Sequence, residues 1–383
     1  MTAAKLIRLI PENIFQELAV ETGVDTQVKK LSGELIFKLI LFSMLNSEKL
    51  SLRIMEEYLH SGQFKLFTGY DILEGKYNSI RDRICTIDAD YFEQLFSKIF
   101  TIYNKELREE KALCKADSTM VGLAAKLFTS GMEYGNDKDR RFVKFSVNVK
   151  GSLPSSIKIY TDKKYANENP ALSEVIEHAD CIKGNIVAFD RGLQSRDSFD
   201  KFSDTGKLFV TRNVPKIRCV DAVDNAITDP PPDATVTITG DKTGHLINRA
   251  EKKSKHRYRI ITAKIDKTGE LICFVTNIMD EDAYTIAAWY RLRWEIDIFF
   301  KFIKQYLNVK HLVSRDINGI KVMIYMTMIL AILLIAYKKI NRLKGFKIPK
   351  LRFELELDTE IMREIVVLCG GNPELAPHIF KSG

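Results

Sequence analysis

Three acidic positions of the 383-residue chain lie where a sheet edge or a helix face can gather carboxylates. Asp117 falls inside an expected strand, and Asp190 directly follows the short apolar run 186–189. The third acid belongs to segment 289–307, which is rich in aromatic and charged residues. The six cysteines and six histidines are instead dispersed. The pattern therefore makes the carboxylates the candidates for carrying chemistry.

The third segment sorts its polar residues onto two faces when it is drawn as a helix. At 3.6 residues per turn, each residue is rotated by about 100° from the one before it. Relative to Tyr290, Arg293 and Asp297 lie at about −60° and −20°. Lys304 lies at about −40°, whereas Glu295 falls near the opposite side at about +140°. One narrow face thus carries an aromatic residue, an acid and two cations, which favours a functional stripe over a solvated surface.

Successive spacings of three, four and seven residues separate the members of this stripe and meet the Tyr-Arg-Glu-Lys signature of an enzyme family. The chain resembles the DDE transposases of bacterial insertion sequences, and among them the insertion sequence 4 family. The resemblance extends from Asp117 to about Leu312 and includes an insertion between the second and third acids. Besides the signature, it is carried by the phrases Asp117-Ser-Thr, Phe189-Asp-Arg-Gly and Tyr290-Arg-Leu-Arg-Trp.

The resemblance implies an α/β, RNase H-like fold, in which a mixed sheet is flanked by helices. In that fold the first acid lies on the first strand, the second follows the fourth strand and the third lies on a helix. The implied activity is hydrolysis and transesterification of DNA phosphodiesters at the terminal inverted repeats of the element. Asp117, Asp190 and Asp297 would be the catalytic carboxylates and would hold two Mg²⁺ ions, for which Mn²⁺ can substitute.

The same resemblance implies a set of contacts with double-stranded DNA. Tyr290, Arg293 and Lys304 would contact phosphates near the cleaved end, and Lys301 is a further basic candidate on that helix. Arginine suits this role through its planar fork, and lysine acts as a point charge. Because such enzymes act on paired DNA ends and on a target DNA, a homodimer on DNA is expected.

The sequence departs from the family at the third acid, where Asp297 stands in place of the usual glutamate. Aspartate is one methylene shorter, so it holds the second metal more loosely unless the helix lies closer to the sheet. Glu295 is the nearby glutamate, but its angular position turns it away from the stripe. We therefore predict that Asp297, and not Glu295, is the third ligand.

Two alternative functions are compatible with the same residues. One is a domesticated RNase H-like nuclease with a role other than transposition. The other is a catalytically inactive DNA-binding remnant of a transposase. Metal-dependent nicking separates an enzyme from a binding protein, and transfer of the freed 3′ end into a second DNA separates a transposase from a nuclease.

The elements that must position these residues divide the chain into five expected parts. Apolar residues at helical spacing characterise the first part, whereas alternation and short apolar runs characterise the middle of the chain. The parts are an N-terminal helical domain with possible DNA binding (1–108), the first part of the catalytic core (109–212), an all-β insertion (213–280), the second part of the core (281–345) and a C-terminal tail (346–383).

Two of these elements matter most for the site. Alternation over Arg141–Val149 predicts a half-buried strand. A single long helix is expected from about Glu281 to Leu307, and it would carry the whole stripe. Within the insertion, the basic stretch Lys242–Arg259 either tracks the DNA backbone, with Lys253 and Arg257 as contacts, or is a solvated loop.

The distribution of charge supports a polyphosphate partner. The formal net charge is +8, from 58 Lys and Arg against 50 Asp and Glu. Residues 1–110 contain 14 basic and 17 acidic residues, a net of −3, so the remainder carries +11. Residues 301–350 alone hold 11 basic residues and a single acid, Asp316. Such clustering suits nucleic acid, although a basic face of an ordinary cytosolic protein has the same appearance.

The uncharged run 322–337 raises the question of a membrane span. Its sixteen residues fall short of the roughly 20 that cross a bilayer, so we expect a buried core helix and no membrane. The six cysteines are single and form no CxxC pair, and no signal peptide is visible. These features favour a reducing cytoplasm, and for a bacterial transposase an association with the nucleoid.

Overall fold

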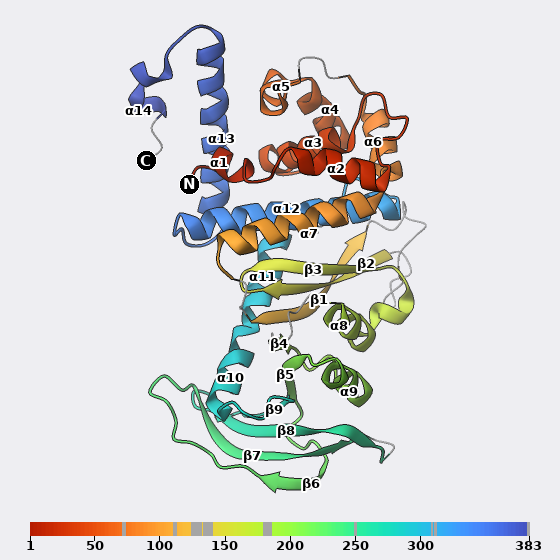
Figure 1. The fold of residues 1–383 in the computed structure, drawn as a ribbon, viewed down its shortest axis with the longest axis vertical. Helices are drawn as coiled ribbons and strands as arrows, with labels where there is room; N and C mark the ends of the chain where they lie inside the picture. Colours follow the sequence, from red (N-terminus) through yellow and green to blue (C-terminus); the bar gives the residue numbers. More distant parts are fainter. Residues whose placement is uncertain are drawn as a thin grey trace.

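The computed structural model describes residues 1–70, 74–109, 113–123, 132, 141–178, 186–248, 251–307, 309 and 312–380. Within these residues the strands form one nine-stranded sheet, in the order β3-β2-β1-β4-β5-β9-β8-β7-β6. The N-terminal helices lie beyond the β3 end of the molecule, and β6–β8 form the opposite end (Figure 1). Helices therefore border the sheet at its β3 end, and further strands continue it at the other end. The two strands that position Asp117 and Asp190, β1 and β4, are neighbours in the interior of the sheet.

Five strands make up the half of the sheet that carries the first two acids. β2 is antiparallel to both β1 and β3, whereas β4 is parallel to β1 and to β5. Parallel neighbours need crossover connections, and α8 (Glu168–Glu177) and α9 (Arg196–Asp204) supply them. This order confirms the RNase H-like prediction. The strands are β1 (Cys114–Leu123), β2 (Arg141–Lys150), β3 (Leu153–Tyr160), β4 (Ile186–Phe189) and β5 (Leu208–Asn213).

The prediction of a half-buried β2 is wrong, because eight consecutive residues from Val143 onward are buried. One side of the strand, including Phe145, joins the large apolar cluster beneath the helices. The polar side is covered as well: the Lys144 ammonium donates to the carbonyls of Ala166 and Asn167, each at 3.2 Å. An alternating pattern indicates two chemically different faces, and here both faces are packed.

The insertion is all-β, as predicted, and its strands continue the core sheet. β9 pairs antiparallel with β5, so that Val210 faces Thr276. A buried ion pair between Arg259 and Asp241, at 2.5–3.0 Å, joins β8 to β7. The strands are β6 (Cys219–Asp224), β7 (Val236–Ile247), β8 (Lys253–Ile265) and β9 (Leu271–Thr276).

The N-terminal region is helical, as the apolar spacing predicts. Serine side chains cap three of its helices: Ser32, Ser51 and Ser61 each accept a bond from a backbone N–H three residues later. The helices are α1 (Ala3–Ile7), α2 (Asn13–Thr22), α3 (Gly33–Asn46), α4 (Leu52–His60), α5 (Gly62–Thr68), α6 (Tyr77–Thr86) and α7 (Ala89–Glu106).

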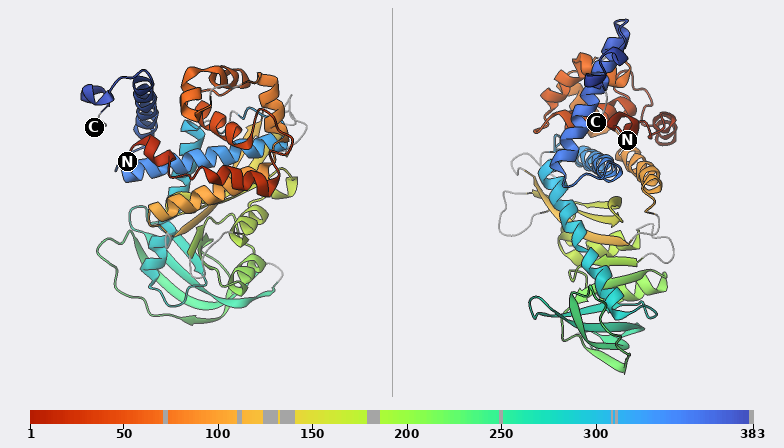
Figure 2. Two further views of the ribbon diagram at one scale, coloured as in Figure 1. Left: turned by 45° about the horizontal axis from the view of Figure 1, so that its top comes forward. Right: turned by 90° about the vertical axis from the view of Figure 1, so that its left-hand side faces the viewer.

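The long apolar helix α12 (Ile317–Ile340) is the centre of the upper half of the molecule. It is long and apolar enough to cross a membrane, yet 94% of its most apolar window is buried within the protein. It contacts α6, α7 and β3, and Figure 2 shows it lying between the N-terminal helices and the sheet. The prediction of a buried core helix is confirmed. α13 (Lys347–Leu368), a short 3₁₀ turn (Pro373–Leu375) and α14 (Pro377–Phe380) follow it.

Shortening a buried side chain of α12 should lower the stability of the protein. Leu333 is fully buried, so Leu333→Ala should lower the free energy of unfolding by about 2–5 kcal/mol through lost burial and a residual cavity. Val20 on α2 is 78% exposed, and Val20→Ala should change it by less than about 0.5 kcal/mol. Chemical denaturation measures both. Equal effects of the two substitutions would contradict the assignment of α12 as the core.

Candidate active site

The register of two parallel strands brings the first two acids together. β1 pairs with β4 so that Ala116 lies opposite Phe189. Asp117 and Asp190 are the residues that directly follow these two. Asp190 follows the last residue of β4, and the carboxyl ends of neighbouring parallel strands lie at one edge. The side chain of Asp117 accepts a hydrogen bond from the backbone N–H of Ser118 at 2.7 Å.

The helix of the third acid is interrupted, which corrects the prediction of one continuous helix. α10 (Ala283–Leu292) and α11 (Trp294–Tyr306) meet at Arg293. There the backbone N–H of Arg293 bonds to the carbonyl of Tyr290, and that of Ile296 bonds to the carbonyl of Arg293, each at 3.0 Å. These three-residue steps tighten the turn. The break lies inside the signature, between its tyrosine and its acid.

Arg293 is the cation that joins the acids. Its guanidinium lies 3.1 Å from Asp297 Oδ2 and 3.7 Å from Asp117 Oδ2. Its side chain is only 12% exposed, so solvent screens these contacts weakly. The hydroxyl of Tyr290 donates to Asp190 Oδ1 at 3.3 Å, and the Arg293 guanidinium lies 5.8 Å from the centre of the Tyr290 ring. The structure therefore brings five of the predicted site residues into one cluster.

Burial dominates the electrostatics of this cluster. It raises the pKa of Asp117 to about 6; the Ser118 N–H and Arg293 oppose the shift, whereas the charges of Asp297 and Asp190 add to it. Burial, assisted by the charge of Asp190, also raises the pKa of Tyr290 to about 12. The Tyr290 phenol is consequently protonated at neutral pH and serves as a hydrogen-bond donor to Asp190.

Glu295 faces a different part of the sheet. Its carboxylate pairs with the ammonium of Lys115 at 2.6 Å, and Lys115 is only 3% exposed. Lys115 also donates to the carbonyl of Gly151. The sequence analysis missed Lys115, although its place two residues before Asp117 puts both side chains on one face of β1. This pair fixes the rotation of α11 and leaves Asp297 with Arg293.

The donor set suits a hard divalent cation, because it consists of carboxylate oxygens alone. Asp297 Oδ2 is buried and forms no hydrogen bond, since its ion pair with Arg293 lacks hydrogen-bond geometry. Among the described residues no three acidic, histidine or cysteine side chains lie close enough to hold an ion together. In this arrangement Arg293 supplies the positive charge between Asp117 and Asp297, and the orphaned oxygen is available to a further cation.

Two further charged residues border the cluster and were missed by the sequence analysis. Burial lowers the pKa of Lys144, and the charges of Glu168 and Asp117 oppose that shift. Gly192, at the end of the Asp-Arg-Gly phrase, leaves room for Glu168, because a Cβ at this position would lie 1.7 Å from Glu168 Oε2. The sequence signal for Lys144 was its position among the polar residues that alternate with apolar ones along β2.

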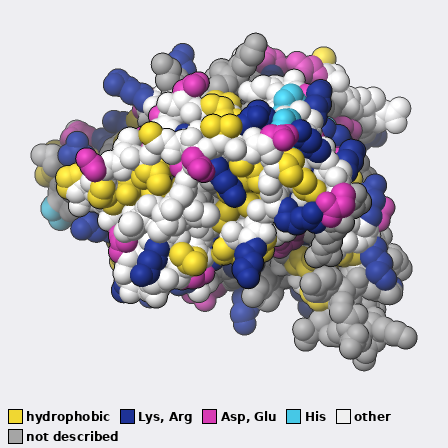
Figure 3. All heavy atoms as spheres, turned by 90° about the horizontal axis from the view of Figure 1, so that it is seen from below, with side chains coloured by type: hydrophobic (Ala, Val, Ile, Leu, Met, Phe, Trp, Pro, Cys, Tyr) yellow, Lys and Arg dark blue, Asp and Glu magenta, His cyan; other side chains and the backbone are white. Residues whose placement is uncertain are grey.

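The remaining predicted DNA contacts lie outside the cluster. Lys301 is exposed on α11, and Lys304 lies with its ammonium 5.9 Å from the centre of the Phe300 ring. On the insertion, Lys253 pairs with the Asp221 side chain, and Arg257 donates to the carbonyls of Asp221 and Thr243 at 3.0 and 2.9 Å. The underside of the molecule mixes basic and acidic side chains (Figure 3). Arg249 and Lys310 lie outside the described residues.

Comparison with known proteins identifies two matching families and several similar proteins. Residues 115–334 match the transposase DDE domain family, and residues 2–68 match a domain of unknown function, DUF4372. A probable transposase for insertion sequence element IS5377 from Geobacillus stearothermophilus is 25% identical over 272 residues, 69% of this chain and 68% of that protein. A putative transposase, y4zB, from Sinorhizobium fredii is 31% identical over 117 residues, 30% and 32% of the two chains.

One similar solved structure is a piggyBac transposase synaptic complex with hairpin DNA. It is 10% identical, has a TM-score of 0.45, and covers 95% of this chain and 82% of that chain.

The raised pKa of Asp117 should make its replacement stabilising above pH 6. Burial holds the pKa of Asp117 in the folded protein at about 6, above the ordinary value of 3.8, so ionisation destabilises the folded protein progressively as pH rises from about 4 to 6. In EDTA at pH 7.5, Asp117→Asn should therefore raise the free energy of unfolding by about 2–3 kcal/mol. The gain should shrink toward zero near pH 4. Denaturant titration at both pH values measures it, and an equal gain at both would contradict the shift.

Proposed function

The chain belongs to the transposase DDE domain family, and from this premise we propose that it cuts and joins DNA at the ends of an insertion sequence through Asp117, Asp190 and Asp297. The protein is a DNA transposase of the DDE type, and this family uses divalent metal ions. The observation that carries the proposal is the convergence of the three carboxylates on Arg293 and Tyr290 from β1, the end of β4 and the first turn of α11.

We propose Mg²⁺ as the metal, bound by Asp117, Asp190 and Asp297 as two ions, with Mn²⁺ able to substitute. Bound divalent cations of this kind activate a water or a 3′-hydroxyl and stabilise the leaving oxygen. The oxygen-only donor set and the orphaned Asp297 Oδ2 support this choice. A bound cation would also favour the ionised form of Asp117, whose pKa is raised by burial.

The other residues of the cluster have proposed roles in binding and orientation. Tyr290 holds the Asp190 carboxylate through its protonated hydroxyl. Arg293 keeps Asp117 and Asp297 close together in the absence of metal, and its planar fork suits a DNA phosphate when DNA and metal bind. Lys304 and Lys301 would extend the positive surface along α11 and contact the backbone of the same DNA end.

The signature also supports placing the chain in the insertion sequence 4 family. Its arginine pairs with its acid, Asp297, and its tyrosine donates to Asp190, so all three belong to the same cluster. We propose Asp297 as the third ligand, because Glu295 already neutralises the buried Lys115. Replacement of the family glutamate by aspartate then requires α11 to lie close to β1, and these two elements are in direct contact.

Beyond the cluster, we propose that a homodimer binds the terminal inverted repeats and the target DNA in the bacterial cytoplasm, at the nucleoid. We also propose that the five parts of the chain have separate roles, with residues 1–108 as a DNA-binding unit. Lys253 and Arg257 are proposed contacts to the DNA backbone. Their bonds to Asp221 and Thr243 would hold them in place on the insertion until a phosphate replaces those partners.

Substitutions of the acids test the assignment of ligands. With Mg²⁺ and a duplex carrying the element end, Asp190→Asn and Asp297→Asn should each reduce cleavage at least about 100-fold, because a carboxylate ligand is lost. Glu295→Gln is the matched control on the same helix and should retain cleavage within a few-fold. Nicking of labelled DNA measures all three. An active Asp297→Asn beside an inactive Glu295→Gln would reverse the assignment.

Metal dependence and strand transfer test the reaction itself. EDTA should stop cleavage, and added Mg²⁺ or Mn²⁺ should restore it, because the carboxylates need a cation to act on a phosphodiester. The freed 3′ end should then join a supercoiled plasmid, which a gel detects as labelled plasmid. Cleavage without joining would instead support a nuclease, and DNA binding without cleavage would support an inactive remnant.

A further inference from the structure

Helix α13 has two apolar faces, and only one of them is packed. The inner face repeats every four residues and is buried against the helical region: Pro349, Phe353, Leu357 and Ile361. The outer face carries large apolar side chains that are 43–54% exposed: Ile348, Leu351, Leu355, Met362 and Ile365. An exposed apolar stripe of this length on a surface helix marks a site of association.

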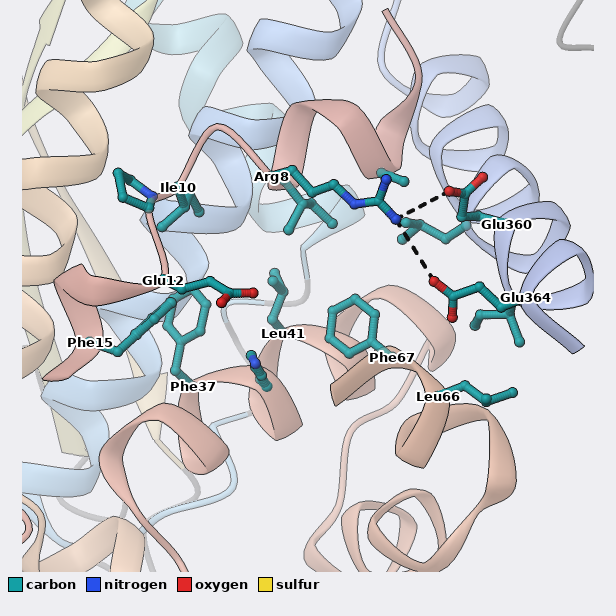
Figure 4. Close-up of a pocket in the computed structure, with 16 residues that line it drawn as sticks. Arg8, Ile10, Glu12, Phe15, Phe37, Leu41, Leu66, Phe67, Glu360 and Glu364 are labelled. Carbon is teal, nitrogen blue, oxygen red and sulfur yellow. Dashed lines mark hydrogen bonds and ion pairs between the residues drawn. The ribbon is translucent and has the colours of Figure 1, made fainter. Parts of the chain in front are cut away.

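The inner contacts fix the orientation of α13, so the outer stripe cannot turn inward. The guanidinium of Arg8 lies 3.2 Å from Glu360 and 3.8 Å from Glu364 (Figure 4). The hydroxyl of Tyr337 on α12 donates to Glu356 at 2.7 Å. A cavity of about 400 Å³ lies behind these ion pairs, between α13 and the N-terminal helices. Helix α13 runs along the outer side of the helical region (Figure 2), and the side chains of its outer stripe are exposed to solvent.

The spacing of the outer residues is that of a coiled-coil seam. Steps of three, four, three, four and three residues run along the stripe from Ile348 to Ile365, with Asp358 as its one acidic member. A repeat of three and four residues keeps side chains on the line where two helices meet. The four-residue steps of the inner face follow a different line around the helix. A partner helix is therefore the surface that the outer stripe fits.

Charge identifies the partner and its direction. Residues 344–352 contain four basic residues and no acid, whereas residues 353–364 contain five acids and one basic residue, Arg363. Two parallel copies would place like charges side by side, whereas two antiparallel copies place the basic part of each helix beside the acidic part of the other. A helix with the complementary charge order is thus present in every copy of this chain.

We propose that two copies of the protein associate through antiparallel α13 helices. Each Ile348 packs against Ile365 of the second copy, and each Leu351 packs against Met362 of the second copy. This register leaves Asp358 within reach of Arg352 of the second copy. This dimer is the homodimer of the proposed function, and its role in holding paired DNA ends rests on that function. The association itself needs no DNA.

The mass of the full-length protein in DNA-free solution tests the association. Sedimentation at micromolar concentration should give a dimer of the 43.9 kDa chain. Leu355→Glu and Ile365→Glu should weaken dimerisation at least 100-fold and give monomers with unchanged circular dichroism, because both side chains are exposed in the single copy. Val20→Glu is the matched control on another exposed apolar residue and should remain dimeric. A wild-type monomer, or dimeric seam variants, would overturn the proposal.

Cross-linking tests the antiparallel direction. In a Cys369→Ser background, which removes an exposed thiol, Ile348→Cys and Ile365→Cys are prepared as separate proteins. Neither should form a disulfide dimer alone, whereas an equimolar mixture should do so on mild oxidation. Cross-linking of Ile348→Cys with itself would show a parallel pair and overturn the register. Cleavage by a wild-type protein that is monomeric would refute the α13 dimer and leave the proposed reaction standing. A wild-type dimer that does not cleave would refute only the proposed reaction.

Discussion

The central architecture buries Asp117 beside two further acids, Asp190 and Asp297, and the charge placed around Asp117 is the constraint on which the rest of the site depends. Like charges at short range repel strongly when water is excluded. Burial is the main cause of the raised pKa of Asp117, and the charges of Asp297 and Asp190 add to that shift. Arg293 provides the compensation, because its guanidinium lies between Asp117 and Asp297 and is itself largely buried. This positive charge offsets part of the repulsion between Asp117 and Asp297.

The elements around Arg293 fix its position from several sides. The tight turn between α10 and α11 sets the direction of its side chain, and the Lys115–Glu295 pair prevents α11 from rotating. The insertion contributes as well. Arg259 on β8 donates to the carbonyls of Met279 and Glu281, just before α10 begins, while it pairs with Asp241. The insertion therefore braces the start of the helix that leads into the site.

The upper half of the molecule positions the same site through apolar packing. One apolar cluster joins the N-terminal helices, α11, α12, α13 and one face of β2 and β3. Phe300 of α11 packs edge-on against Phe145 of β2, so α11 is anchored to the sheet one turn beyond Asp297. Because this core is shared, the N-terminal helices, the sheet and the outer helix α13 are mechanically connected. A partner bound at α13 would thus be linked to the carboxylates through packed elements.

The sequence by itself determined the parts of the structure that depend on local pattern. The β4 run, the serine-capped helices, the uncharged α12 and the shared face of Tyr290, Arg293 and Asp297 all follow from spacing and propensity. The RNase H-like order came from the resemblance to a family, since periodicity alone does not define which strands are neighbours. Asp117 and Asp190 were singled out because each lies in or after an expected strand.

Tertiary structure decided everything that depends on contacts between distant residues. It covered both faces of β2, joined the insertion to β5, and broke the long helix at Arg293. It also gave Lys115 and Lys144 their places beside the acids, which no local pattern specifies. The physical reason is that burial and charge compensation are properties of the assembled neighbourhood. A sequence window reports which residues share a face, but only the fold determines what lies against that face.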